Sequence, residues 1–337
     1  MKKLIGIIAA LAMITGSAYA ADWNFYGSAR VSTFVTDADS TDNTSFAEGL
    51  QGNSRIGAKV KANDSVSGRI EYGAAEGKAN VRLLYGTWNF GAGSLTVGQD
   101  YTPMNAFYSN QVYAGDADLL AQGGIYSGRK ALVALKFGNF EIAAVETQTD
   151  KLGLTDPTIE KNFPGVEMAY RTKFNNIGLF LTAGYNTYEI NALDVDTWVV
   201  GAGAKADFGS AYLAGNIYTG QNAGHMIAID IDNDGKWNDG KAKVAGGKVV
   251  DNDALGFILV AGYKANDMFT FEAGYGYAKT EFDEAASDDD TATAYYLQSV
   301  ITLAPGVYVI PEIGVVDGED AGEEKNTYYG AKWQINF

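Results

Sequence analysis

The amino-acid sequence predicts an all-β fold, an antiparallel transmembrane β-barrel of about sixteen strands. Apolar and polar residues alternate along many short segments, and tight turns rich in Asn, Gly and Asp join these segments in pairs. The hydrophobic fraction is 47%, but no apolar run reaches the roughly 20 residues that a membrane-spanning helix needs. Such a chain either folds as a soluble β protein or crosses a membrane as a closed sheet, because lipid requires paired backbone groups.

The last stretch of the chain, 326–337, is an alternating strand that ends on an aromatic residue. One face carries Tyr329, Ala331, Trp333, Ile335 and Phe337, and the other carries Tyr328, Gly330, Lys332, Gln334 and Asn336. A terminal strand with one apolar face leaves an open sheet edge, which invites aggregation, whereas closing a barrel removes that edge. We therefore expect this strand to close a barrel.

Residues 1–20 have the pattern of a secretory signal peptide, with two lysines, an apolar run and the small-residue cleavage site Ala18-Tyr19-Ala20. Its removal leaves residues 21–337, which we expect to form a single barrel domain because no compositional linker divides them. Cysteine is absent, so this exported domain does without disulfides.

The charge balance is acidic, with 25 basic and 41 acidic residues. Loss of Lys2 and Lys3 with the signal peptide leaves 23 basic residues and a net charge of about −18 (23 minus 41). This balance argues against a nucleic-acid partner.

We predict sixteen strands, at 23–35, 53–62, 68–74, 81–90, 94–99, 130–137, 140–148, 166–174, 177–188, 197–208, 211–219, 255–264, 268–280, 293–303, 307–316 and 326–337. Seven tight turns join them on one side, at Asn63-Asp64, Gly91-Ala92-Gly93, Gly138-Asn139, Asn175-Asn176, Gly209-Ser210, Asn266-Asp267 and Pro305-Gly306. Eight longer connections lie on the other side, as an up-and-down barrel with both termini on one side requires. Pro311 falls inside a predicted strand, where its missing N–H predicts a bulge or a strand boundary.

The two faces of these strands differ in polarity. The face assigned to the interior carries Arg30, Arg55, Lys59, Arg69, Glu71, Glu167, Arg171, Lys173, Lys205, Asp207, Glu272 and Glu312. The face assigned to lipid carries Val166, Met168, Tyr170, Ile177, Leu179, Leu181, Val200, Ala202, Phe269, Phe271, Tyr275, Ile313 and Val315. So many interior charges exclude a dry core, and we predict a membrane barrel with a polar interior wide enough for water.

Alternation stops between residues 99 and 128. A connection of this length inside a compact domain is usually functional or disordered. Its aromatic residues and the pair Leu119-Leu120 predict that it is ordered against the rest of the protein.

Several local patterns resemble the general, trimeric porins of Gram-negative bacteria, among them those of sulfate-reducing bacteria. FYGSARV (25–31) is similar to that family's first strand, NSRIGAKV (53–60) to its second, and KWQINF (332–337) to its closing strand. RLLYGTWNFGAGSLTVGQDYTP (82–103) is similar to its fourth and fifth strands and the start of its third external loop. The resemblance covers nearly the whole mature chain. It implies a homotrimer that is exported through the periplasm and embedded in the outer membrane, in contact with lipid and lipopolysaccharide.

The same resemblance implies that segment 99–128 folds into the barrel and narrows it, with acids on the loop opposite basic residues on the wall. The residues implied for this constriction are Arg55, Arg82, Arg129, Asp100, Asp116 and Asp118, and strand parity adds Arg30. The sequence departs from the family in lacking a Pro-Glu-Phe-Gly-Gly pattern, and Arg82 shares the parity of Leu84. Salt bridges from these arginines to Glu71, Glu167 or Glu312 are the alternative interpretation, and both can hold together.

The function predicted is passive diffusion of ions and small hydrophilic solutes, sieved by size and charge at segment 99–128. Acids crowd the external segments 283–290 and 319–324, which predicts a weak cation preference that the arginines oppose. A substrate-selective channel is the alternative if the loop aromatics line a sugar path, and these are Tyr101, Phe107, Tyr108, Tyr113 and Tyr126. A non-conducting structural or adhesive barrel is another. An outer-membrane hydrolase would use the only histidine, His225, but no nucleophile motif supports it, so we expect no enzyme.

A second candidate site lies in the connection 221–253, whose acidic residues include Asp230, Asp232, Asp234 and Asp239. Oxygen ligands at alternate positions followed by Gly235 resemble the start of a calcium-binding loop. Lys241 stands where that loop has its bidentate glutamate, so a solvated acidic loop is the competing interpretation. We expect no cofactor other than this candidate calcium ion.

Overall fold

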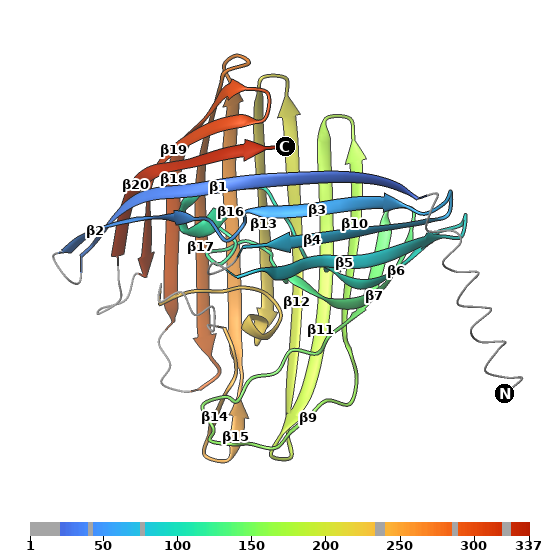
Figure 1. The fold of residues 1–337 in the computed structure, drawn as a ribbon. Coiled ribbons are helices and arrows are strands. Elements are labelled where there is room, and N and C mark those ends of the chain that lie inside the picture. Colours follow the sequence, from blue (N-terminus) through green and yellow to red (C-terminus); the bar gives the residue numbers. More distant parts are fainter. Residues whose placement is uncertain (1–20, 40–42, 75–77, 233–239, 285–288, 319–324) are drawn as a thin grey trace, which may run out of the picture.

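The protein is an antiparallel barrel whose computed structural model describes residues 21–39, 43–74, 78–232, 240–284, 289–318 and 325–337 (Figure 1). Residues 1–20, the predicted signal peptide, lie outside this range. Within the described residues no helix is both long enough and apolar enough to cross a membrane.

Sixteen strands of the described chain form the closed barrel. They are β1 (Asp22–Ala38), β3 (Arg55–Lys61), β4 (Val66–Gly73), β5 (Asn80–Asn89), β6 (Ser94–Tyr101), β7 (Arg129–Phe137), β8 (Phe140–Val145), β10 (Gly165–Phe174), β11 (Ile177–Ile190), β12 (Leu193–Phe208), β13 (Ala211–Gln221), β16 (Asn252–Lys264), β17 (Phe269–Phe282), β18 (Asp290–Ala304), β19 (Val307–Gly318) and β20 (Lys325–Asn336). Four short strands accompany them: β2 (Asn43–Leu50), β9 (Ile159–Glu160), β14 (Lys243–Ala245) and β15 (Lys248–Val250).

The terminal strand closes the barrel, as predicted. β20 pairs with β1 from Ser28↔Asn336 to Ala38↔Asn326, and Figure 1 shows the two strands side by side. The backbone of Phe337 exchanges two hydrogen bonds with Gly27, so the pairing extends to the last residue. The short strands β2 and β9 add pairing at the strand ends. β2 pairs with residues 31–38 of β1, and β9 pairs with residues 189–190 of β11.

The seven tight turns lie where the sequence predicts them. Their side chains explain the choice of residue: Asn63 Oδ1 accepts the N–H groups of Ser65 and Val66, each at 2.9 Å, which replaces the hydrogen bonds lost where the ladder ends. One longer connection was predicted wrongly. β11 and β12 continue to a two-residue turn at Asn191 and Ala192, both with positive φ, so the connection between them is tight.

Pro311 stays inside β19, opposite Ala331 of β20, and has no registered partner in β18. Neither a strand boundary nor a bulge lies at this residue, and the irregularity of the β18–β19 ladder is at Thr302 and Ala304. Proline fits because its missing N–H falls at a gap in that ladder.

The outer face is apolar over the middle of the strands, as predicted. Leu179, Leu181 and Ile313 are 43–55% exposed, and Phe174 and Phe208, next to the tight turns, are 60–70% exposed. The opposite face holds the charged residues: Glu71, Glu167, Glu272 and Glu312 are at most 4% exposed. This polarity is that of a barrel surrounded by lipid.

The interior is not entirely polar, which corrects the sequence-based prediction. Segment 222–232, which begins with the 3-10 helix η3 (Ala223–His225), packs with segment 102–128 against the inward side chains of β11 to β13. The apolar residues Ile125, Met226 and Ile229 are at most 4% exposed in this cluster. One part of the barrel interior is therefore filled by an apolar core.

Candidate functional site

Segment 102–128, between β6 and β7, is held by three wall carboxylates. Glu167 of β10 accepts the Met104 N–H at 3.1 Å, and Glu272 of β17 accepts the Asn110 N–H at 2.8 Å. Glu312 of β19 accepts the N–H groups of Val112 at 2.6 Å and Tyr113 at 3.0 Å. An irregular segment has unpaired backbone donors and a buried carboxylate needs donors, so each satisfies the other.

Close backbone contact adds to this attachment. A Cβ atom at Gly276 of β17 would lie 2.1 Å from the carbonyl oxygen of Gln122, and one at Gly123 would lie 2.2 Å from that of Phe257. Gly123 also has φ +99°, which disfavours any other residue. The segment can lie this close to the wall only because both positions are glycine.

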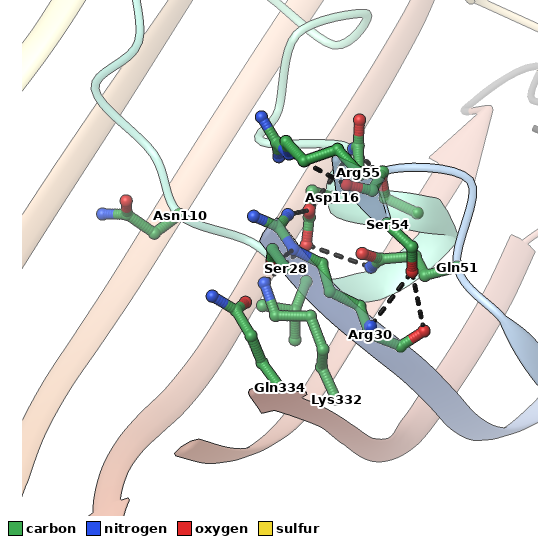
Figure 2. Close-up of polar contacts among 12 residues, drawn as sticks. Ser28, Arg30, Gln51, Ser54, Arg55, Asn110, Asp116, Lys332 and Gln334 are labelled. Atoms are coloured by element: carbon green, nitrogen blue, oxygen red, sulfur yellow. Dashed lines mark hydrogen bonds and ion pairs between the residues drawn. The ribbon is translucent and has the colours of Figure 1, made fainter. Parts of the chain in front are cut away.

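Asp116 is the centre of the polar cluster in Figure 2. It ends the short helix α2 (Tyr113–Asp116), whose distorted backbone gives Asp116 a φ of +66°. Its carboxylate binds Arg30 of β1, and its Oδ1 atom lies 2.7 Å from the Lys332 Nζ of β20. Gln51 Nε2 donates to the same Oδ1 at 3.0 Å. In this arrangement a loop acid faces two basic residues of the wall.

The two loop acids differ in their electrostatics. Burial alone would raise the pKa of Asp116, but the charges of Lys332 and Arg30 outweigh it and lower that pKa. Burial raises the pKa of Asp118 well above its ordinary value, and the neighbouring charge of Asp116 raises it further. The surroundings therefore favour the ionised form of Asp116, the partner of the wall cations, and disfavour the ionised form of Asp118.

Arg82 faces the interior because of a bulge. The β4–β5 register shifts between Glu71 and Tyr72, which pair with Leu83 and Val81 respectively. Val81 and Leu84 point outward, 40% and 49% exposed, while Arg82 is 3% exposed. A bulge places two residues opposite one and so changes the parity of the strand. Strand parity alone left the direction of the Arg82 side chain open, and the bulge turns it toward the interior.

Arg82 and Arg55 share one wall carboxylate. Arg82 Nε donates to Glu71 Oε1 at 2.8 Å, whereas the Arg55 Nη1 atom lies 3.7 Å from the same oxygen. Arg82 is thus part of a wall salt bridge, as the alternative interpretation held. Arg55 is the more weakly neutralised of the two.

A cavity of about 390 Å³ brings five of the predicted site residues together: Arg30, Arg55, Arg82, Asp116 and Asp118. Its other lining residues are Asn53, Tyr101, Phe107, Asn110 and Lys332. Two predicted residues do not line it. Asp100 accepts the N–H of its own neighbour Tyr101 at 2.8 Å, and Arg129 stacks over the Tyr101 ring, 5.4 Å from its centroid, beside a different cavity.

Sequence reasoning missed Lys332 and Asn53 as members of this cavity. Lys332 is the only charged residue on the polar face of the closing strand, so strand parity was a signal that would have found it. Asn53 lies outside the regular strands. Its Oδ1 atom accepts a hydrogen bond from Arg82 Nη1 at 2.5 Å, and no pattern in the sequence indicates this contact.

The loop aromatics do not form a continuous path. Tyr101 and Phe107 line the cavity, and their ring centroids are 5.2 Å apart. Tyr113 instead stacks on Tyr328, with centroids 3.7 Å apart, and Tyr108 packs against the apolar core. The cavity is therefore mainly charged, with one aromatic corner.

A sequence model of the Gram-negative porin family matches residues 8–321. The chain belongs to this family. Among curated proteins, none matches the chain significantly.

Three solved structures illustrate the fold of this porin. The outer membrane channel DcaP of Acinetobacter baumannii is similar with a TM-score of 0.76 at 14% identity, covering 95% of this chain and 98% of that one. The anion-selective porin of Comamonas acidovorans gives 0.66 at 14% identity, covering 94% and 100%. The trimer form of OmpT from Vibrio cholerae gives 0.62 at 17% identity, covering 94% and 99%.

Family and fold together make this porin an outer-membrane diffusion channel. His225, the residue on which a hydrolase would depend, is 4% exposed and packs edge-on against Tyr188. Burial lowers the pKa of His225 to about 4, and the charge of Lys241 contributes. Within the described residues its Nε2 atom has no hydrogen-bond partner.

The candidate calcium site remains a prediction. Asp234 and Asp239 lie outside the described residues. Asp230 is buried and its N–H donates to the Ala121 carbonyl at 3.1 Å, whereas Asp232 is exposed. The two described aspartates therefore differ in their access to a cation.

Proposed function

We propose that this porin passes ions and small hydrophilic solutes passively and sieves them by size and charge beside segment 102–128. The observation that carries the proposal is the pairing of Asp116, on the segment, with Arg30 and Lys332, on the wall. Opposite charges fixed across a polar passage produce a transverse field, which orients water and dipolar solutes. The apolar core around Ile125 and Met226 leaves the aqueous path to the side lined by these charges.

The lining charges favour anions. Four cationic groups, Arg30, Arg55, Arg82 and Lys332, oppose Asp116, Asp118 and Glu71, and the raised pKa of Asp118 removes part of the opposing charge. The acidic balance of the whole chain favours cations instead. Charges more than about 8 Å from the path are largely screened at physiological salt. We therefore propose an anion preference, opposite to the preference predicted from composition.

Conductance across planar lipid bilayers tests the function. We expect steady currents that persist when a voltage is applied. Neutral solutes of graded size should lower the current only if they are small enough to enter the channel. A barrel that conducts nothing would refute the proposal. If neutral solutes of every size changed the conductance equally, the channel would conduct but would not sieve by size.

The assembly proposed is a homotrimer in contact with outer-membrane lipid and lipopolysaccharide. The trimer form of OmpT, with 99% of its length covered, supports this assembly. Mass determination of the detergent-solubilised porin tests it, with three chains expected.

A substrate-selective channel is the second candidate, favoured by the half-exposed Phe107 beside Tyr101 in the charged cavity. An aromatic surface next to arginines would hold the C–H face of a sugar ring, or a planar solute. Such a channel would show conductance that saturates with one solute and is blocked by it, whereas general diffusion would not.

Calcium binding to 230–239 is a separate proposal, supported by the spacing of the acidic residues. Trp237 lies within that stretch and reports on it. Its fluorescence should change on calcium titration, and an unchanged signal would leave only a solvated acidic loop.

A further inference from the structure

A second cavity, of about 360 Å³, lies apart from the one that contains Asp116. It is lined by residues 126–130, residues 148–149, residues 224–228 and Lys241. The two cavities share no lining residue. Tyr126 lines this second cavity and Tyr101 lines the first, and the centroids of their rings are 6.5 Å apart. These two aromatic rings therefore lie between the cavities. We refer to this second space as the His225 cavity.

Three cationic side chains line the His225 cavity, and one of them is not neutralised. Lys241 pairs with Asp150 at 2.9 Å, and Lys130 lies 3.8 Å from Glu167. Among the described residues, Arg129 forms no salt bridge, and its contact with the Tyr101 ring leaves its charge uncancelled. The balance of the lining is therefore positive.

The cavity also has polar groups without partners. Within the described part of the chain, the buried atoms His225 Nε2 and Arg129 Nη1 have no hydrogen-bond partner. Leaving a buried polar group unpaired is costly, so two such groups beside one cavity are suited to a ligand or water that binds there. His225 is 4% exposed and its position is fixed by packing against Tyr188, which makes it a preformed part of the site.

We propose that the His225 cavity binds a small oxyanion, the phosphate or carboxylate group of a solute. The guanidinium of Arg129 supplies the charge and a planar pair of donors, Lys130 supplies a second charge, and His225 supplies a neutral imidazole N–H. The volume exceeds that of one such group, so the body of a small solute fits beside it. The site would hold an anion near, but not in, the cavity of Asp116.

The sole histidine of the chain makes this site directly observable. The tag-free mature porin, labelled with ¹⁵N-histidine and held in detergent micelles, gives one set of imidazole signals. We would titrate it with inorganic phosphate and separately with acetate, at constant ionic strength, with chloride as the reference anion. We expect a saturable shift with at least one oxyanion and none with chloride, and the two titrations distinguish phosphate from carboxylate recognition.

Variants test whether Arg129 binds the anion. Arg129→Gln should weaken binding by about tenfold or more, which corresponds to about 1.4 kcal/mol, and Arg129→Lys should weaken it less. Lys205→Gln is the matched control, because it removes a cation that contacts Tyr212 in another part of the barrel and should leave the affinity unchanged. Heat-modifiable gel mobility shows whether each variant folds, and Arg129→Lys serves if Arg129→Gln does not.

The proposal is overturned if no oxyanion gives a saturable shift, if chloride acts like phosphate, or if the Arg129 variants bind as tightly as the original chain. The signal is read without a membrane or a current. Failure here would therefore leave the proposed channel function untouched, and loss of conductance would not affect this result.

Discussion

Lys332, on the closing strand β20, places its ammonium group 2.7 Å from the Asp116 carboxylate of the segment between β6 and β7. Arg30, which binds the same carboxylate, lies on β1, the strand that pairs with β20. Both cations thus come from the seam where the barrel closes. The charged cluster is complete only when the first and last strands have paired, which couples assembly of the site to closure of the fold.

Asp116→Asn removes the charge that neutralises Arg30 and Lys332. Two nearly buried cations lose their partner, so we expect a local loss of about 3 kcal/mol and a stronger anion preference. The reversal potential across a planar bilayer under a salt gradient should shift further toward the anion side. Asp267→Asn, in the exposed pair with Lys264 at a turn, is the control and should change nothing. An unshifted potential in Asp116→Asn would contradict the assignment.

Arg55→Gln should act in the opposite direction. The Arg55 Nη1 atom is 3.7 Å from Glu71, so its charge is weakly neutralised and its loss costs little stability. We expect the anion preference to fall and the temperature of heat modification to stay the same. Lys61→Gln, which removes an exposed ion pair with Asp64, is matched in charge. If both variants shift the potential equally, the effect belongs to total charge and not to the cavity.

Gly276→Ala should displace segment 102–128. The added Cβ would lie 2.1 Å from the Gln122 carbonyl oxygen, whereas at Gly86 the nearest atom, the Ser67 carbonyl oxygen, is 3.9 Å away. We expect larger and noisier single-channel currents from Gly276→Ala and ordinary currents from Gly86→Ala. Both should still form barrels by gel mobility. Identical currents would mean that the segment does not limit the passage.

The selectivity should depend on pH through Asp118. Burial raises the pKa of Asp118 well above its ordinary value, so its carboxyl keeps a proton where an ordinary aspartate has lost it. As pH rises through the raised pKa, the group becomes negative and the anion preference should fall. Asp118→Asn should keep the low-pH selectivity across this range. A variant with the same pH profile as the original chain would exclude Asp118 as the titrating group.

The tight turns were predictable because their chemistry is local. An asparagine such as Asn63 or Asn266 caps its own turn, whatever the rest of the barrel does. The ends of β11 and β12 were not predictable from alternation. Where β11 and β12 extend past the lipid-facing band, their outer face is in water and their inner face packs on other segments. Val195 is therefore buried, whereas Asp194 and Asp196 are exposed. The polarity of the faces inverts there, and the apolar pattern breaks although the strands continue.

The site was predictable in part. Strand parity placed Arg30 and Arg55 correctly, but a bulge changes parity at Arg82, and pairing register is set by the neighbouring strand. The alternating Ile227, Ile229 and Ile231 indicate that segment 222–232 has a buried face. The residues that cover this face come from distant segments, so the sequence does not show where the segment packs. Which arginines share a carboxylate likewise depends on contacts between distant strands.

The most direct test places a single thiol in the charged cavity. The chain has no cysteine, so Arg55→Cys carries the only thiol, and Lys264→Cys places one at an exposed turn. A bulky thiol-reactive reagent added during a bilayer recording should lower the Arg55→Cys current and leave the Lys264→Cys current unchanged. If the Arg55→Cys current persists after mass spectrometry confirms modification, ions do not pass beside Arg55 and the account of the passage is wrong.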